Sequence, residues 1–342
     1  MSLLVINADR FEGHTPPPGH PERRERQDVM HVVAQRQRER GATVAEPEPA
    51  SREQILRVHT AGFVARLEAT AGSAVMLDPD TFTSPESWDV TRLAAGAAAM
   101  AVDAVLDGAA SRAAALVRPP GHHSGRDRAR GFCLLNNVAV AAAQAVARGV
   151  PRVAVIDFDV HHGNGTQEIF EADPRVLYVS THQWPFYPGS GLVTDVGVGD
   201  GEGFTVNVPL ERGATDADYD IVFRDLVLPV VRLFSPGMIL VSAGFDAHER
   251  DPLGGMRMSA AGLALLTRHV VAVADECCEG RMVLVTEGGY NLEAFAASLD
   301  AALDVMAGRG QLPAADVPEP SARGLAASTQ ARAVQARYWR GL

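Results

Sequence analysis

The feature that most constrains the fold is a series of short apolar runs separated by alanine-rich stretches. The apolar runs are at residues 3–6, 114–117, 153–156, 176–179, 204–208, 238–241 and 282–285. The alanine-rich stretches are at residues 87–107, 137–148, 217–234, 259–276 and 292–306. Unbroken apolar runs suit strands buried on both faces, and their alternation with helices indicates a parallel sheet. The sequence therefore predicts an α/β fold: a single three-layer domain with a mostly parallel central sheet flanked by helices.

The same alternation defines the domain organisation. It continues without a long linker to about residue 309, so we expect one domain over residues 1–310. Residues 311–342 are predicted to form a Pro/Ala-rich connection and a C-terminal helix at about 326–340 that packs on the same domain.

Composition excludes several classes of protein. Hydrophobic residues make up 46% of the 342 residues and charged residues 21%, which argues against a fully disordered chain. The net charge of −11 argues against a nucleic-acid partner. No run of 18 apolar residues and no signal-peptide pattern occurs, so no membrane association is expected. Three cysteines without paired spacing favour a reducing, cytoplasmic location.

Titratable residues mixed with glycine follow four of the predicted strands. The segments are Arg-Pro-Pro-Gly-His-His at 118–123, Asp-Phe-Asp-Val-His-His-Gly-Asn-Gly at 157–165, Ser-Ala-Gly-Phe-Asp-Ala-His at 242–248 and Thr-Glu-Gly-Gly-Tyr at 286–290. Ligand sites of open parallel sheets lie beyond the carboxyl ends of the strands. This concentration of titratable groups is therefore the strongest indication of function in the sequence.

The second and third segments contain possible metal ligands. Asp157, Asp159 and His161 alternate at period two, so on an extended segment they share one face. Two of them, together with Asp246 from a neighbouring strand end, would form an Asp/His/Asp site with a position left open for water. These ligand types suit zinc, manganese or iron and do not choose between them. The alternative is a solvated loop without a metal.

The first and last segments contain possible proton carriers. A histidine near its ordinary pKa of ~6.5, such as His122 or His123, can take a proton from water and return it to a leaving amine. Asp157 and Asn164 are available to bond the other ring nitrogens. Tyr290 follows two glycines and offers a phenol to a developing oxyanion. Alone, the two histidines would be interpreted as surface residues in a turn.

These motifs resemble the zinc-dependent histone deacetylases of the arginase/deacetylase superfamily. The resemblance is closest to the class II enzymes and their bacterial homologues, which include acetylpolyamine amidohydrolases. It extends from Pro-Gly-His-Pro-Glu-Arg at 18–23 to Tyr-Trp at 338–339. The two prolines before the histidine pair and the asparagine at 164 indicate class II.

The resemblance implies roles for individual residues. One zinc ion per chain would be bound by Asp159, His161 and Asp246, although iron in the cell is not excluded. The catalytic groups would be His122 paired with Asp157, His123 paired with Asn164 as general base and acid, and Tyr290 as the donor that polarises the carbonyl.

The resemblance also implies one or two structural potassium ions and a substrate tunnel. The first potassium site would consist of Asp157, Asp159, His161, Ser180 and Thr181. The second would consist of Phe170, Asp173, Val176 and Phe204. The residues of the tunnel would be Phe132, Tyr187, Leu253, Gly131 and Gly288.

The same resemblance indicates the class of substrate. Leu253 stands where a polyamine-specialised relative has an acidic residue, and segment 181–191 lacks the long insertion of bacterial acetylpolyamine enzymes. We therefore expect a metal-dependent amidohydrolase that removes acetyl or acyl groups from acetyl-lysine-like amines. The alternatives are an amidohydrolase of acetylpolyamines or other N-acyl small molecules, and a catalytically weak module that binds acyl-lysine.

A two-manganese ureohydrolase is disfavoured, because His248 stands where those enzymes have a further aspartate. A homo-oligomer is left open.

Overall fold

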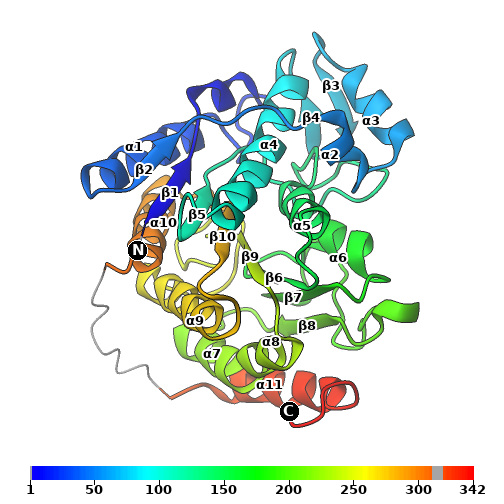
Figure 1. Ribbon diagram of the computed structural model, residues 1–342, viewed down its shortest axis with the longest axis vertical. Helices are drawn as coiled ribbons and strands as arrows, with labels where there is room; N and C mark the ends of the chain where they lie inside the picture. Colours follow the sequence, from blue (N-terminus) through cyan, green and yellow to red (C-terminus); the bar gives the residue numbers. More distant parts are fainter. Residues whose placement is uncertain (1, 310–318) are drawn as a thin grey trace.

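The computed structural model describes residues 2–309 and 319–342, and its centre is an eight-stranded sheet (Figure 1). The strand order is β2-β1-β5-β10-β9-β6-β7-β8, and every pairing is parallel. The strands are β1 (Leu3–Ile6), β2 (Thr43–Ala45), β5 (Arg112–Ala115), β6 (Val153–Asp157), β7 (Val176–Gln183), β8 (Thr205–Leu210), β9 (Met238–Ala243) and β10 (Met282–Thr286). The predicted α/β architecture is confirmed.

The uninterrupted apolar runs are explained by burial on both faces of the sheet. In β6, Ala154 and Ile156 belong to one hydrophobic core, and Val153 and Val155 belong to the other. All four are fully buried. Because successive side chains of a strand point to opposite faces, a strand covered on both sides needs an apolar residue at every position.

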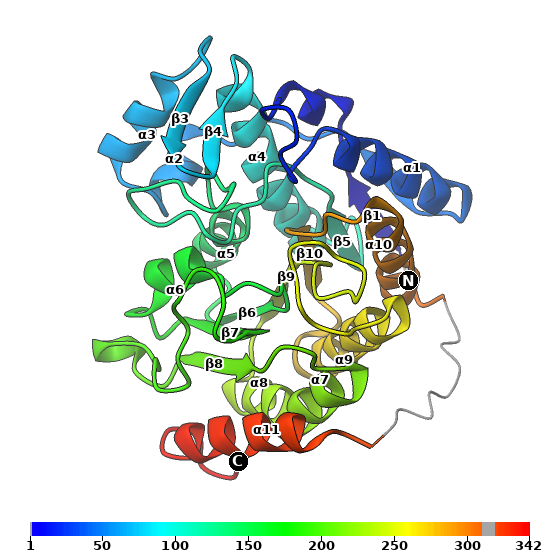
Figure 2. The same ribbon diagram turned by 180° about the vertical axis from the view of Figure 1, so that it is seen from behind.

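Two layers of helices cover the faces (Figures 1 and 2). One layer contains α1 (Glu25–Glu39), α7 (Asp216–Val222), α8 (Leu228–Phe234), α9 (Ala260–Cys278), α10 (Leu292–Met306) and α11 (Ala322–Gln335). The other contains α2 (Arg52–Leu56), α3 (Ala61–Glu68), α4 (Ser87–Leu106), α5 (Asn137–Ala147) and α6 (Asn164–Phe170). Among the described residues, no helix has the length and apolar character needed to span a bilayer.

Several elements differ in extent from the prediction. The helix predicted over 217–234 is α7 and α8 joined by a π-helical turn, Phe223–Val227. The strand predicted at 114–117 begins two residues earlier, and the C-terminal helix runs from Ala322 to Gln335 instead of 326–340. The antiparallel hairpin β3 (Val75–Asp78) and β4 (Thr81–Thr83) and the short edge strand β2 were not predicted. Val75 and Met76 on β3 are exposed, so these apolar residues do not belong to a buried strand.

The C-terminal helix packs against β8 and α7. Gln335 Nε2 donates to Thr205 O at 3.1 Å, and Trp339 Nε1 donates to Gly203 O at 3.1 Å. Ser321 N donates to Asp218 Oδ1 at the other end of the helix. Most of the predicted connection, residues 310–318, lies outside the described residues.

The strand order brings the four titratable segments together. Strands β5, β10, β9 and β6 are consecutive neighbours in the middle of the sheet, so the loops that follow them meet at one edge. Asp157, the last residue of β6, lies opposite Ser180 of β7 and Ser242 of β9. The predicted gathering of these segments therefore follows directly from the topology.

Candidate active site

Asp159, His161 and Asp246 form a cluster at the centre of this edge. Their ligand atoms all lie within 4.8 Å of one another. His161 Nδ1 is 3.1 Å from Asp159 Oδ1 and 3.2 Å from Asp246 Oδ2. The two carboxylates are almost fully buried. Asp157, the third of the alternating residues considered as ligands, is not part of this cluster, and its carboxylate bonds to His122.

This cluster fits a divalent cation. Asp246 Oδ2 is buried and accepts no hydrogen bond from the described residues. Gly244 and Gly288 pack so closely that a Cβ on either would overlap the carboxylates of Asp159 or Asp246. Burial and the Asp159 carboxylate raise the pKa of Asp246 to about 7, because two negative charges are held together in a poorly solvated site. A bound cation would relieve this repulsion, and the donor set of two carboxylates and one imidazole is suitable for zinc.

His122 is paired with Asp157. Its Nδ1 is 3.0 Å from Asp157 Oδ2, which also accepts a hydrogen bond from Tyr178 Oη at 3.1 Å. Burial of the imidazole opposes protonation, but the carboxylates of Asp157 and Asp159 outweigh it and raise the pKa of His122 to about 10. The pairing with Asp157 therefore favours the protonated form of the His122 imidazole.

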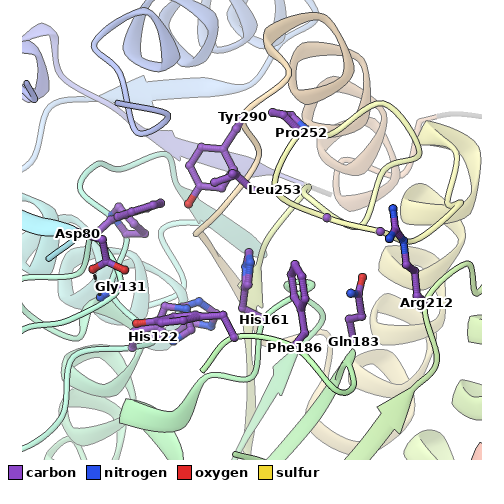
Figure 3. Close-up of a pocket in the computed structure, with 16 residues that line it drawn as sticks. Asp80, His122, Gly131, His161, Gln183, Phe186, Arg212, Pro252, Leu253 and Tyr290 are labelled. Carbon is purple, nitrogen blue, oxygen red and sulfur yellow. Dashed lines mark hydrogen bonds between the residues drawn. The ribbon is translucent and has the colours of Figure 1, made fainter. Parts of the chain in front are cut away.

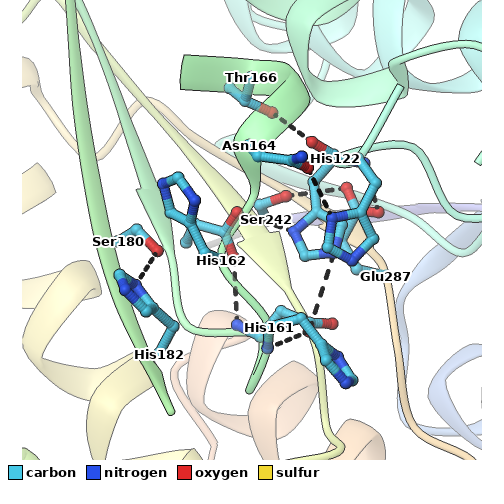
Figure 4. Close-up of polar contacts among 12 residues, drawn as sticks. His122, His161, His162, Asn164, Thr166, Ser180, His182, Ser242 and Glu287 are labelled. Atoms are coloured by element: carbon cyan, nitrogen blue, oxygen red, sulfur yellow. Dashed lines mark hydrogen bonds and ion pairs between the residues drawn. The ribbon is translucent and has the colours of Figure 1, made fainter. Parts of the chain in front are cut away.

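His123 is paired with Asn164, which lies beside His122 in Figure 4, and it has the opposite electrostatic character. Its Nδ1 is 2.9 Å from Asn164 Oδ1, and its ring centroid is 4.1 Å from that of His122. Burial, together with the positive charges of His122 and His161, holds the pKa of His123 well below its ordinary value. Because an amide oxygen only accepts, Nδ1 carries the proton and Nε2 keeps a free lone pair.

Glu287 organises the histidine segment, a role that sequence reasoning missed. Its Oε2 accepts from Gly121 N at 2.6 Å and His122 N at 3.1 Å, and its Oε1 accepts from Ser242 Oγ at 2.8 Å. The side chain is fully buried and joins the loop after β5 and strand β9 to the end of β10. A glutamate two residues after the apolar run at 282–285 was the available signal.

A cavity of about 410 Å³ opens above these groups (Figure 3). Phe132 contacts Tyr290 edge-on with ring centroids 5.8 Å apart, and Tyr187 contacts His123 edge-on at 5.1 Å. Phe186, which was not predicted, stacks on His161 at 5.3 Å. The predicted tunnel residues Gly131, Phe132, Tyr187 and Leu253 all line this cavity.

Gly288 is not among the residues that line this cavity, and its predicted place in the tunnel stays a prediction. Its N–H donates to Asp159 Oδ2 at 2.9 Å. Its part in the site is to let the backbone approach the two carboxylates, since a Cβ there would overlap Asp246.

Tyr290 is directed into the cavity from the loop after β10, as Figure 3 shows. Its backbone N–H donates to Asp251 Oδ2 at 2.6 Å, and the Arg26 guanidinium lies 5.1 Å from its ring centroid. Burial raises the pKa of its phenol well above the ordinary value. The hydroxyl therefore stays protonated and can donate a hydrogen bond.

The residues predicted for the potassium sites also lie in two groups. Ser180 is opposite Asp157 in the sheet, and Thr181 Oγ1 is buried without a hydrogen bond within the described residues. In the second group, Asp173 N donates to Phe170 O, Val176 N to Asp173 O, and Tyr178 N to Phe204 O. The binding of potassium at either group stays a prediction.

The mouth of the cavity contains further residues that carried no motif. Asp80 comes from the β3–β4 hairpin, Gln183 from the end of β7, Arg212 from the turn after β8, and Pro252 from the loop after β9. These segments are far apart in the sequence, so only the folded structure brings them together.

The chain is similar to proteins that are named as deacetylases. A probable deacetylase of Archaeoglobus fulgidus is 42% identical over 299 residues, covering 86% of this chain and 82% of the relative. The human polyamine deacetylase HDAC10 is 41% identical over 314 residues, covering 86% of this chain but only 45% of the relative. The crystal structure of the HDA15 HD domain matches with a TM-score of 0.93 and 37% identity, covering 99% of this chain and 97% of that one.

The family itself follows from a match along most of the chain. The model of the histone deacetylase domain matches residues 20–306, which include all four segments of the site. Together with relatives named as deacetylases, this match shows that the chain belongs to the histone deacetylase family of hydrolytic enzymes.

Proposed function

We propose that the protein is a zinc-dependent amidohydrolase that removes an acetyl or other acyl group from a primary amine, with acetyl-lysine-like compounds as substrates. The observation that carries this proposal is the floor of the cavity. There the Asp159–His161–Asp246 cluster lies beside two histidines, one bonded to a carboxylate and the other to an amide. Hydrolysis of an unactivated amide needs these three elements: a Lewis acid, a charge stabiliser and a proton carrier.

Asp159, His161 and Asp246 would hold the zinc ion. When bound, zinc supplies a Lewis acid at the amide carbonyl. The Gly288 N–H fixes Asp159 Oδ2, and the Val160 N–H fixes Asp246 Oδ1 at 2.9 Å, so both carboxylates are oriented before any ion binds.

His123 would carry the proton. Its free Nε2 accepts a proton from the attacking water while the water oxygen bonds to the carbonyl carbon. The same proton then passes to the amine nitrogen as the C–N bond breaks, giving a carboxylic acid and a primary amine. The acid then loses its proton to the amine, so the products leave as a carboxylate and an ammonium ion. Asn164 holds the ring in the tautomer that this sequence requires.

Two further groups would stabilise the negative charge that develops on the carbonyl oxygen. His122, kept cationic by Asp157, contributes a positive charge at the floor. Tyr290 contributes a phenolic hydrogen bond from the opposite wall. Potassium at the predicted sites would brace the ends of β6 and β7, where Thr181 Oγ1 lacks a partner within the described residues.

The proposed unit is the domain at residues 1–310 with α11 packed on it, and its motifs favour class II. Leu253 leaves an apolar side chain at the mouth, which favours acetyl-lysine-like substrates over polycations. Polyamines are the second candidate, because one relative with 41% identity is named a polyamine deacetylase.

The deciding experiment is hydrolysis of an acetyl-lysine peptide beside N-acetylputrescine and N-acetylspermidine. The zinc-loaded protein is assayed in potassium buffer, with a hydroxamate inhibitor as control. We expect hydroxamate-sensitive turnover of the peptide and little turnover of the polyamines. A preference for the polyamines would overturn the substrate and keep the reaction. Hydroxamate binding without turnover would indicate a binding module and overturn the proposed function.

A further inference from the structure

The mouth of the cavity has opposite charges on opposite sides. Figure 3 places Asp80 on one side and Arg212 on the other, with Tyr290 and His161 between them. The Asp80 carboxylate is already engaged, because its Oδ1 accepts from Gly131 N at 3.2 Å and Thr81 Oγ1 at 2.9 Å. The Arg212 guanidinium is exposed and forms no ion pair within the described residues.

Arg212 belongs to a group of three arginines around the turn after β8. A Cβ on Gly213 would lie 3.0 Å from Arg323 Nη1 and 4.0 Å from Arg257 Cδ. Arg323 Nη1 also donates to Arg212 O at 2.6 Å. All three side chains are exposed, and within residues 2–309 and 319–342 none pairs with a carboxylate. Three exposed guanidinium groups therefore gather around this turn in a chain whose net charge is −11.

A second polar group without a partner lies beside Arg212. Gln183 lines the cavity and is 4% exposed, yet its Oε1 makes no hydrogen bond within the described part of the chain. A Cβ on Gly255 would lie 2.7 Å from Gln183 Oε1 and 2.9 Å from Arg212 Nε. The two side chains therefore flank the same glycine, and the absence of a side chain at Gly255 lets both of them pack against its backbone.

We propose that Arg212 and Gln183 form a carboxylate-binding subsite at the cavity mouth, so that the substrate carries a carboxylate beyond its acylated aliphatic stem. The guanidinium can donate two parallel hydrogen bonds to a carboxylate. Gln183 Oε1 is an acceptor, so the amide adds a third hydrogen bond once it is turned by 180° and its NH₂ group replaces the oxygen. This inference rests on the proposed amidohydrolase function and makes its substrate class more specific.

The proposed subsite would also disfavour acetylpolyamines as substrates. An acetylpolyamine has cationic amines where this subsite would expect an anion, and the Arg212 group repels them. Two kinds of molecule present the required carboxylate: a free Nε-acyl amino acid, through its α-carboxylate, and an acyl-lysine peptide with an acidic residue beside the modified lysine.

The test compares substrates that differ in one charge. The zinc-loaded protein is assayed with Nε-acetyl-lysine and its α-carboxamide, with acetyl-lysine peptides carrying Asp or Asn beside the lysine, and with N-acetylputrescine. We expect kcat/KM about tenfold higher for the carboxylate of the matched pair, mostly through KM, as for a charge-assisted hydrogen bond. The pair that shows the preference identifies the source of the carboxylate.

Arg212→Glu should abolish the preference, measured as the ratio of kcat/KM between the two substrates of each matched pair. Arg257→Glu is the matched control: it makes the same charge change on a neighbouring side chain that does not line the cavity, and it should keep most of the preference. Equal loss in both variants would show a general field and overturn the subsite.

Binding measurements distinguish a failure of the carboxylate-binding subsite from a failure of the proposed hydrolysis. The affinities of two linear hydroxamates, one ending in a carboxylate and one in a carboxamide, are measured by calorimetry on both variants. A tenfold difference that Arg212→Glu removes would support the subsite even if no substrate is turned over, in which case the proposed hydrolysis fails. Equal affinities, or equal kcat/KM for both matched pairs, would overturn the subsite and leave the hydrolytic proposal standing.

Discussion

The floor and the mouth of the cavity are built in opposite ways. The floor, here Asp157, Asp159, His161, Asp246, His122 and His123, consists of side chains that are at most 12% exposed and are held by short hydrogen bonds from central strand ends. The mouth, here Asp80, Gln183, Arg212 and Leu253, is assembled from four separate segments, and its Arg212 is exposed and forms no ion pair within the described residues. We therefore assign catalysis to the floor and substrate selectivity to the mouth. Changes to the floor should lower kcat for every substrate, and changes to the mouth should alter the ranking of substrates.

The largest effect is expected from Asp246→Ala on the floor. Removing one of three ligands should abolish tight zinc binding and lower kcat by at least about 10³-fold, because Lewis-acid stabilisation is worth several kcal/mol. Zinc content after dialysis and initial rates are measured together. Asp225→Ala, which removes a carboxylate on the π-helical turn, is the control. Stoichiometric zinc in the Asp246 variant would contradict the assigned ligand set.

Tyr290→Phe should lower kcat by roughly 10²–10³-fold, the loss typical of one oxyanion donor. Zinc content and hydroxamate affinity should change little, since the phenol is not among the proposed ligands. Tyr338→Phe, in the exposed C-terminal segment, should behave as the wild type. A Tyr290 variant with an unchanged rate would remove the tyrosine from the mechanism.

Asn164→Ala should lower kcat about 10- to 100-fold for all substrates alike, the usual cost of losing a group that orients a catalytic histidine. Asn164→Asp should restore most of the rate. Its negative charge should also raise the pKa of His123 and move the acidic limb of the pH–rate profile to higher pH. An unaltered profile in the Asp variant would indicate that Asn164 is only structural.

The stability of the fold should depend on the titration of the buried His59. His59 accepts from Asn136 N and bonds to Gly125 O, and burial lowers its pKa to about 4. The folded pKa lies below the unfolded value of ~6.5, so the unfolded chain takes up the proton first. Stability is then lost as pH falls from about 6.5 towards 4, by about 2 kcal/mol from this group between pH 7 and pH 5.

Urea unfolding at pH 7 and pH 5 in the presence of a chelator measures this dependence. His59→Gln should reduce the pH dependence by that amount, whereas His31→Gln, at an exposed position, should not. If the two variants show the same pH dependence, His59 is not the titrating group.

The smallest effect is expected at the mouth. Leu253→Glu places a carboxylate where an acetylpolyamine would extend its free amines, and it should shift the polyamine to acetyl-lysine ratio by about fivefold, the upper range for an exposed ion pair. Leu253→Gln controls for size and polarity. A parallel fall for both substrates would mean that position 253 acts on the floor, and the division between floor and mouth would fail.

The sequence predicted the floor because its residues follow buried strands and alternate at a fixed period. The grouping of Asp159, His161 and Asp246 needed only the parallel order of β6 and β9. The mouth could not be predicted, because Asp80 and Arg212 lie 132 positions apart and only tertiary structure brings them to the same cavity. Strand β2 was missed for a related reason: its three residues are partly exposed and carry no apolar run.

The packing of α11 on β8 has a consequence for biosynthesis. Strand β8 is at the edge of the sheet, and unpaired edges attract other strands. The bond from Gln335 to Thr205 spans 130 residues. A ribosome adding about 5–20 residues per second needs on the order of 10 s to make that stretch. During that interval the nascent edge lacks its cover, so a chaperone that shields it would be most useful between the emergence of β8 and the docking of α11.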